Sequence, residues 1–118
     1  MNDLMKKHFA NPKNMGKIKK PTHFVKYKSG FCGDTIELYV LVENGIVSEV
    51  KYNVFGCYAI ISAASILSEW AIGKTVNEVT SVNIDDVIAL MGGDVETEKY
   101  NCVSVAVKAF TTFIDNPK

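Results

Sequence analysis

The strongest constraint on the fold is a pair of apolar stretches joined by Asn44-Gly45. In the first stretch, 34–43, apolar side chains recur at every second position, which is the pattern of a strand with one buried face. Both central residues of a type I′ turn need a positive φ, and Asn-Gly meets that need well. The second stretch, 46–55, follows at once. We therefore predict an antiparallel hairpin, and we leave open which alternate residues of 46–55 face inward.

Helices are expected before and after this hairpin in the sequence, and one more strand is expected before it. Asn11-Pro12 should end the first helix, because a residue that precedes proline avoids the α region. Gly73 stands where a helix cap belongs, and Thr75 and Glu78 have capping-box spacing. The predicted helices are 2–10, 58–72, a short one after Thr75, 85–91 and 103–115, and the added strand is 22–28. This order indicates an α+β fold with an antiparallel sheet packed against several helices.

The composition is that of an ordinary globular protein. The 118 residues fit one domain, 1–118, and hydrophobic residues make up 47% of them. Because 13 basic and 13 acidic side chains cancel, no strong field is available to hold a nucleic acid. The chain has no apolar run long enough to span a bilayer and no signal-peptide pattern. We expect no nucleic acid partner, no membrane partner and a cytoplasmic location.

Positive charge is concentrated near the N-terminus. Asp3 is the only carboxylate before Asp34, and it is opposed by Lys6, Lys7, Lys13, Lys17, Lys19, Lys20, Lys26 and Lys28. A solvated basic face is the favoured interpretation, and a docking surface for an acidic protein patch is the alternative. We expect residues 1–21 to be flexible until a partner binds, because this basic segment has few anchors.

The three cysteines lie far apart in the sequence but fall at the ends of predicted elements. Cys32 and Cys57 flank the hairpin, so antiparallel pairing brings both to one end of the sheet. Cys57 and Cys102 lie near helix N-termini, where the helix dipole is expected to lower the pKa of a thiol. In a reducing compartment this arrangement suits zinc or an iron–sulfur cluster. The alternative is that each cysteine is a small buried apolar residue.

Short motifs around the cysteines favour metal binding over the interpretation as small buried apolar residues. Residues 8–16 read HFANPKNMG, Cys32-Gly33-Asp34 and Gly56-Cys57 follow, and residues 99–104 read KYNCVS. Ser65, Glu69-Trp70 and Gly73-Lys74 fall in order between them. In these motifs, and over nearly its whole length, the chain resembles the IscU/NifU-type iron–sulfur cluster assembly scaffolds.

The resemblance implies a three-stranded antiparallel sheet packed against helices, and a carrier role. A cysteine desulfurase would supply sulfur as a persulfide, a [2Fe–2S] cluster would form, and the cluster would pass to recipient apo iron–sulfur proteins. Cys32, Cys57 and Cys102 resemble the cluster ligands, and Cys102 resembles the persulfide acceptor. Asp34 resembles the aspartate that takes part in ligation and keeps the cluster labile. Lys99 matches a lysine near the site, and zinc can occupy the same ligand set in such proteins.

The chain also departs from the pattern of this family. Asn101 stands where histidine usually precedes the third cysteine, which favours Asp34 as the fourth ligand; His23 is the other candidate for the lost histidine. Residues 95–99, VETEK, replace the segment that a dedicated Hsp70-type chaperone reads, so the resemblance gives no support for chaperone-assisted transfer. Tyr58 follows Cys57 where a smaller residue is usual, and it is expected to be either a lid over the cluster or a core aromatic.

The leading hypothesis is a scaffold and not an enzyme, because no phosphate-binding loop, HExxH motif or Ser/His/Asp set is present. The first alternative is a zinc protein that accepts sulfur at a closed Cys₃Asp site. A sulfurtransferase that uses Cys102 and a pure interaction module are further alternatives. His8 is expected to stabilise local structure more than to dock a partner, and Glu69 and Trp70 are expected to be packing and surface residues and not catalytic ones. Whether the chain forms a homodimer stays open.

Overall fold

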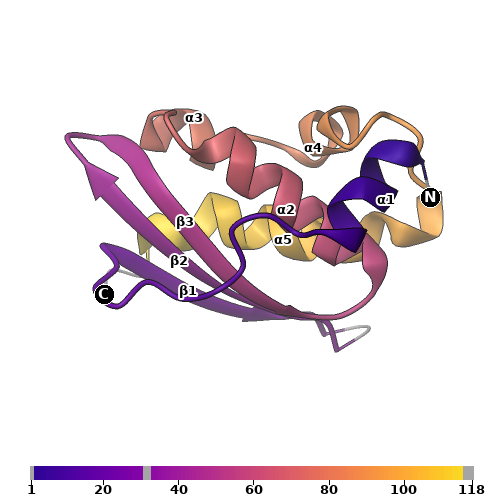
Figure 1. Ribbon diagram of the computed structural model, residues 1–118, viewed down its shortest axis with the longest axis horizontal. Helices are drawn as coiled ribbons and strands as arrows, with labels where there is room; N and C mark the ends of the chain where they lie inside the picture. Colours follow the sequence, from indigo (N-terminus) through magenta and orange to yellow (C-terminus); the bar gives the residue numbers. More distant parts are fainter. Residues whose placement is uncertain (1, 31–32, 116–118) are drawn as a thin grey trace.

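The computed structural model describes residues 2–30 and 33–115, and within that range the chain forms a three-stranded sheet covered by helices (Figure 1). The strands are β1 (His23–Lys28), β2 (Thr35–Glu43) and β3 (Ile46–Phe55), in the order β1-β2-β3. Both pairings are antiparallel. The α+β fold with a small antiparallel sheet is therefore confirmed.

The helices cover one face of the sheet. They are α1 (Asp3–Ala10), α2 (Tyr58–Ala71), α3 (Val76–Thr80), α4 (Ile84–Leu90) and α5 (Tyr100–Thr112), with the 3₁₀ turns η1 (Thr97–Lys99) and η2 (Phe113–Asp115) before and after α5. Helix α5 packs on β1 and β2, α2 packs on β3, and α1 and α4 pack on α2 (Figure 1). None of the helices in the described part of the chain is long and apolar enough to cross a bilayer.

The hairpin forms as its sequence predicts, with one irregularity. Asn44 and Gly45 have φ values of 55° and 78°, as a type I′ turn requires. Leu41 pairs with Glu49 but Val42 pairs with Val47, so Ser48 is an extra residue, a β-bulge. The side chain of Ser48 donates to the Leu41 carbonyl at 3.1 Å.

The bulge settles the open question about the inward face of β3. Val50 and Tyr52 are buried on one alternation, whereas Val47 is buried on the other. Neither alternate set holds along the whole strand, because the extra residue reverses the facing between Val47 and Val50. Val47 is held there by its backbone, which bonds to Lys74 and Gly73 at 2.8 Å each.

The last helix begins earlier than its apolar periodicity predicts. The prediction was 103–115, but α5 begins at Tyr100 and gives way to η2 after Thr112. Cys102 is buried on this helix and extends the apolar face backward, whereas Ile114 is 46% exposed. The prediction was wrong because it counted Ile114 as core and left Cys102 at the edge of the helix.

Helix α2 carries a row of buried serines that fastens the N-terminal segment. Ser65 Oγ accepts from the Lys13 amide at 2.8 Å and lies 2.7 Å from His8 Nδ1. Ser62 donates to the Met5 carbonyl, and Ser68 bonds the Asn14 amide side chain at 3.0 Å. Further along, the Gly16 amide donates to the Tyr52 carbonyl of β3. These contacts join residues of the segment 1–21 to α2 and β3. The expected flexibility of this segment stays a prediction.

Candidate metal centre

Three segments that are distant in sequence meet at one end of the sheet. Asp34 precedes β2, Cys57 caps α2 directly after β3, and Cys102 lies in the first turn of α5. Thr35 pairs with Phe55, so the hairpin sets Asp34 beside Gly56 and Cys57. The β3–α2 corner and the start of α5 lie together at the right of Figure 1.

The potential ligand atoms of this corner lie close together. One carboxylate oxygen of Asp34 and the sulfurs of Cys57 and Cys102 all lie within 4.8 Å of one another. Ligand atoms of a tetrahedral site with bonds of about 2.0–2.3 Å lie roughly 3.3–3.8 Å apart, so small side-chain movements would suffice to close on a metal. Cys32, the remaining predicted ligand, lies outside the described residues.

Asp34 is buried in a way that points to a ligand role. The residue is 5% exposed, and its Oδ2 has no hydrogen-bond partner among the described residues. A buried carboxylate oxygen without a partner is costly, so such atoms usually have a functional explanation. The neighbouring Gly56 makes room for this carboxylate. A Cβ at Gly56 would lie 2.7 Å from Asp34 Cγ and equally close to Ile60 Cγ2.

The electrostatics of Cys102 correct one prediction from the sequence. Burial raises the pKa of the Cys102 thiol, and the neighbouring Cys57 and Asp34 side chains raise it further. The expected lowering by the helix N-terminus is therefore wrong for this residue. Desolvation and a neighbouring carboxylate outweigh a dipole effect that is confined to one turn. A metal cation bound in this corner would lower the pKa of the Cys102 thiol instead, because a coordinating thiol is deprotonated outright.

The other predicted site residues divide into those near the thiols and those elsewhere. Lys99 is half-buried in η1, and its Nζ lies 5.2 Å from the centre of the Tyr58 ring. Asn101 is exposed on α5. His23 is remote, because it pairs with Val40 whereas Lys28 pairs with Thr35 beside the site. Its ring packs edge-on against Phe113, with ring centres 5.4 Å apart, so the structure does not place it as a substitute ligand.

Tyr58 is partly buried and packs against the hydrophobic core, which favours the core-aromatic interpretation, but its hydroxyl is engaged outside the core. Its hydroxyl donates to Glu96 Oε1 at 2.9 Å, which raises the pKa of the phenol because the bond favours its protonated form. Sequence reasoning missed Glu96 because 38 residues separate it from Tyr58. The close approach of the Asp34 carboxylate to Gly56 was not expected from the sequence either.

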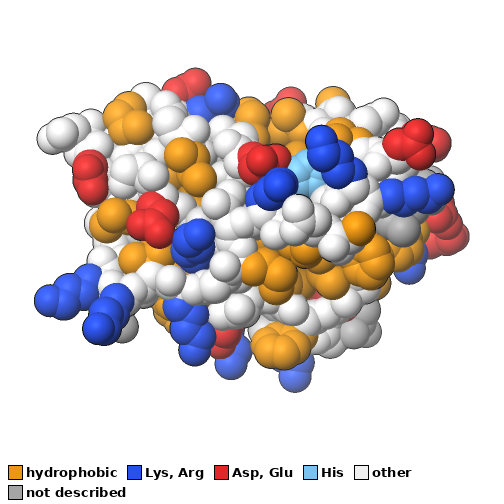
Figure 2. Space-filling view, viewed as in Figure 1, with side chains coloured by type: hydrophobic (Ala, Val, Ile, Leu, Met, Phe, Trp, Pro, Cys, Tyr) orange, Lys and Arg blue, Asp and Glu red, His pale blue; other side chains and the backbone are white. Residues whose placement is uncertain are grey.

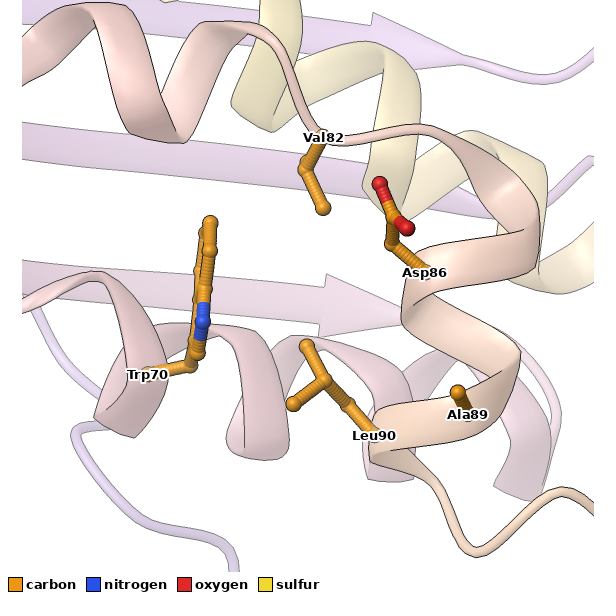
Figure 3. A pocket seen from close by; sticks show the side chains of 5 residues that line it. All are labelled: Trp70, Val82, Asp86, Ala89 and Leu90. Atoms are coloured by element: carbon orange, nitrogen blue, oxygen red, sulfur yellow. The ribbon is translucent and has the colours of Figure 1, made fainter.

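Two hollows lie away from the thiols. The larger, about 430 Å³, opens between the end of α2 and α4, where the Trp70 indole faces Leu90 and Val82 with Asp86 at the rim (Figure 3). Trp70 lies 13 residues after Cys57, or about 20 Å along a helix, so this hollow is separate from the corner. Trp70 packs against the hydrophobic core, as expected, and its ring centre also lies 5.2 Å from the Lys74 ammonium.

The smaller hollow, about 250 Å³, surrounds His8. Lys7, Lys13 and Glu69 line it, and a histidine surface is visible between lysine and acidic side chains in Figure 2. Burial lowers the pKa of His8, whereas Glu69, whose Oε1 lies 3.6 Å from His8 Nε2, opposes that shift. The His8 side chain also contacts Ser65, at 2.7 Å, which agrees with the structural role expected from the sequence.

Comparison with known proteins identifies the family to which this arrangement belongs. The family model described as NifU-like N terminal domain matches residues 2–116. The chain belongs to this family. The chain is also 33% identical over 102 residues to "Iron-sulfur cluster assembly scaffold protein IscU 1" of Archaeoglobus fulgidus, covering 86% of this chain and 66% of that relative. It is 33% identical over 86 residues to "Iron-sulfur cluster assembly enzyme IscU" of Drosophila melanogaster, covering 68% of this chain and 54% of that relative.

Solved structures of other proteins show the same fold. A crystal structure described as a putative iron–sulfur cluster assembly scaffold protein for the SUF system, from Fervidobacterium islandicum, superposes with a TM-score of 0.83. It is 18% identical, and the match covers 97% of this chain and 96% of that one. An N-terminal NifU-like protein from Brucella abortus gives a TM-score of 0.76 at 14% identity, covering 97% of this chain and 91% of that one. The resemblance inferred from the motifs is thereby confirmed.

Proposed function

We propose that this protein is a scaffold on which an iron–sulfur cluster is assembled and from which it is handed on. The observation that carries the proposal is the convergence of Asp34, Cys57 and Cys102 within 4.8 Å at one corner of a NifU-like domain. The names of the relatives support it, since they are called iron–sulfur cluster assembly scaffold proteins. The cluster is cargo in this proposal, so the chain 1–118 acts as one carrier domain and not as an enzyme.

The proposed ligands of a [2Fe–2S] cluster are Cys32, Asp34, Cys57 and Cys102. Three thiolates give firm binding to iron, whereas a carboxylate oxygen is a harder and weaker ligand. Asn101 offers no good ligand atom, which leaves the buried and unpartnered Oδ2 of Asp34 as the better candidate. A site with one weak ligand suits a cluster that must both form and leave.

The proposed sulfur donor is a cysteine desulfurase, and Cys102 is the proposed acceptor. The Cys102 thiolate would attack the outer sulfur of the donor's persulfide, and the donor's own thiolate would leave. Recipient apo iron–sulfur proteins would then take the cluster. Free thiols at Cys57 and Cys102 fit a reducing compartment such as the cytoplasm. Residues 95–99 do not support a role for an Hsp70-type chaperone.

Anaerobic reconstitution with iron, sulfide and a reductant tests the proposal. We expect visible charge-transfer absorption and about two irons and two sulfides per cluster, with assembly abolished in Cys57→Ala. A colourless protein that keeps stoichiometric zinc and refuses iron would favour the alternative, a zinc-binding sulfur acceptor. That outcome would overturn the scaffold proposal and leave the fold assignment intact.

The role of Asp34 gives a sharper prediction. The resemblance implies that this aspartate keeps the cluster labile, so Asp34→Ala should lose its cluster to a chelator more slowly than the parent protein, by about tenfold for a 1.4 kcal/mol change in barrier. The decay of visible absorbance measures this rate. Asp94→Ala removes an exposed acid and serves as the control. Equal rates for Asp34→Ala and the parent would contradict the ligand role of Asp34.

A further inference from the structure

Tyr58 ties together the two segments that carry Cys57 and Cys102. It is the first residue of α2 and follows Cys57 directly. Its hydroxyl donates to Glu96, which precedes η1, at 2.9 Å. The Lys99 ammonium, at the end of η1, lies 5.2 Å from the centre of the same ring. One aromatic side chain thus contacts both ends of the turn that leads into α5.

The turn η1 has few other attachments that could fix its position. None of its residues is buried, and its own backbone bond, from Lys99 to the Glu96 carbonyl at 2.9 Å, is local. The buried residue nearest to its start is Val95. Because α5 continues directly from η1, a shift of η1 would move Cys102, which lies only three residues after Lys99.

Resting on the proposed function, we propose that Tyr58, Glu96 and Lys99 form a clasp that positions Cys102 against Cys57 and thereby slows release of the metal cargo. Tyr58 is a positioning residue in this scheme, since its hydroxyl bonds to Glu96 and acts on the thiols through η1. Phe9 of α1 supports the ring from its edge, with ring centres 6.4 Å apart. Closing the clasp holds the thiols together, and opening it lets Cys102 move away with α5.

A double-mutant cycle on Tyr58→Phe and Glu96→Ala tests the clasp. Each single change removes the same hydrogen bond, so we expect each to speed loss of the reconstituted cluster to a chelator by about fivefold, the equivalent of one ordinary hydrogen bond. The double variant should be no faster than either single variant, because the two residues act through one contact. Glu96→Gln keeps an acceptor oxygen for the hydroxyl and should restore the parent's rate. Tyr39→Phe and Asp94→Ala are the matched controls.

Titration with cobalt(II), read from its thiolate charge-transfer absorption, separates the clasp from the scaffold function. We expect Tyr58→Phe and Glu96→Ala to weaken cobalt(II) binding while Tyr39→Phe does not. If the parent loads no cluster but its cobalt(II) affinity falls in the two clasp variants, the clasp stands and the scaffold proposal fails. If the cluster forms and all variants release it at the parent's rate, the clasp is overturned. Additive effects of the two changes, or equal effects of the controls, would overturn it as well.

Discussion

Gly56 is the residue that allows the carboxylate of Asp34 and the thiol of Cys57 to share one corner. A methyl group at Gly56 would lie 2.7 Å from the Asp34 carboxyl group, well inside contact distance. We expect Gly56→Ala to displace that carboxylate, to lower the free energy of unfolding by about 1–3 kcal/mol through overpacking, and to weaken cobalt(II) binding. Urea unfolding and cobalt(II) titration measure the two effects.

Gly30 provides the matched control for this prediction. A Cβ at Gly30 would meet nothing within 4 Å among the residues that the structure describes. Gly30→Ala should therefore leave stability and metal affinity close to those of the parent. If both glycine variants bind cobalt(II) as tightly as the parent, the close packing at Gly56 has no part in holding the ligand set.

At the scale of elements, α1 depends on a neutral histidine. Burial lowers the pKa of His8 in the folded chain, with Lys7 and Lys13 acting in the same direction and Glu69 against it. The unfolded chain has the ordinary histidine pKa, about 6.5, so it binds the proton more readily. The stabilising contribution of neutral His8 is then complete above pH 6.5 and is lost as the pH falls below it.

Thermal unfolding between pH 7.5 and pH 5 tests this dependence. We expect the midpoint of the parent to fall with acidification more steeply than that of His8→Gln, which cannot take up the proton. The same slope for the parent and for His8→Gln would show that protonation of His8 does not loosen α1 from α2.

The elements also show where sequence patterns are sufficient and where they fail. The hairpin follows from Asn44-Gly45 and from period-two alternation, because both signals act within a few residues. The bulge at Ser48 has no such local signal, since it depends on the bonds of Val47 to Gly73 and Lys74 on a later part of the chain. The inward face of β3 could therefore not be chosen from the sequence.

At the scale of the whole molecule, the candidate ligands join the sheet to two helices. A metal held by Asp34, Cys57 and Cys102 would link the starts of β2, α2 and α5. Any ligand that binds only the folded state adds stability, about 2.7 kcal/mol at a concentration 100 times its Kd. We expect zinc to raise the thermal midpoint of the parent, and a chelator to reverse the rise. Cys57→Ala should show little of this shift, and an equal shift there would contradict binding at this corner.

Much of the candidate site was predictable because family motifs surround the cysteines, which by themselves are a weak signal. Asp34, Cys57 and Cys102 converge as the hairpin geometry and the motifs led us to expect. The contact between Tyr58 and Glu96 was not predictable, since a tyrosine and a glutamate far apart in sequence form no pattern. The pKa of Cys102 was also mispredicted, because burial is a property of the complete fold.

The serine row on α2 has a consequence for how the molecule meets water. Ser62, Ser65 and Ser68 are fully buried beneath the N-terminal segment, yet each carries a hydroxyl that water can satisfy. A helix face whose contacts are made by hydroxyl groups can be hydrated by water when it is exposed, whereas an exposed apolar face promotes aggregation. Separation of the N-terminal segment from α2 would therefore expose three hydroxyl groups on this side of the helix, together with the spot that Met5 covers.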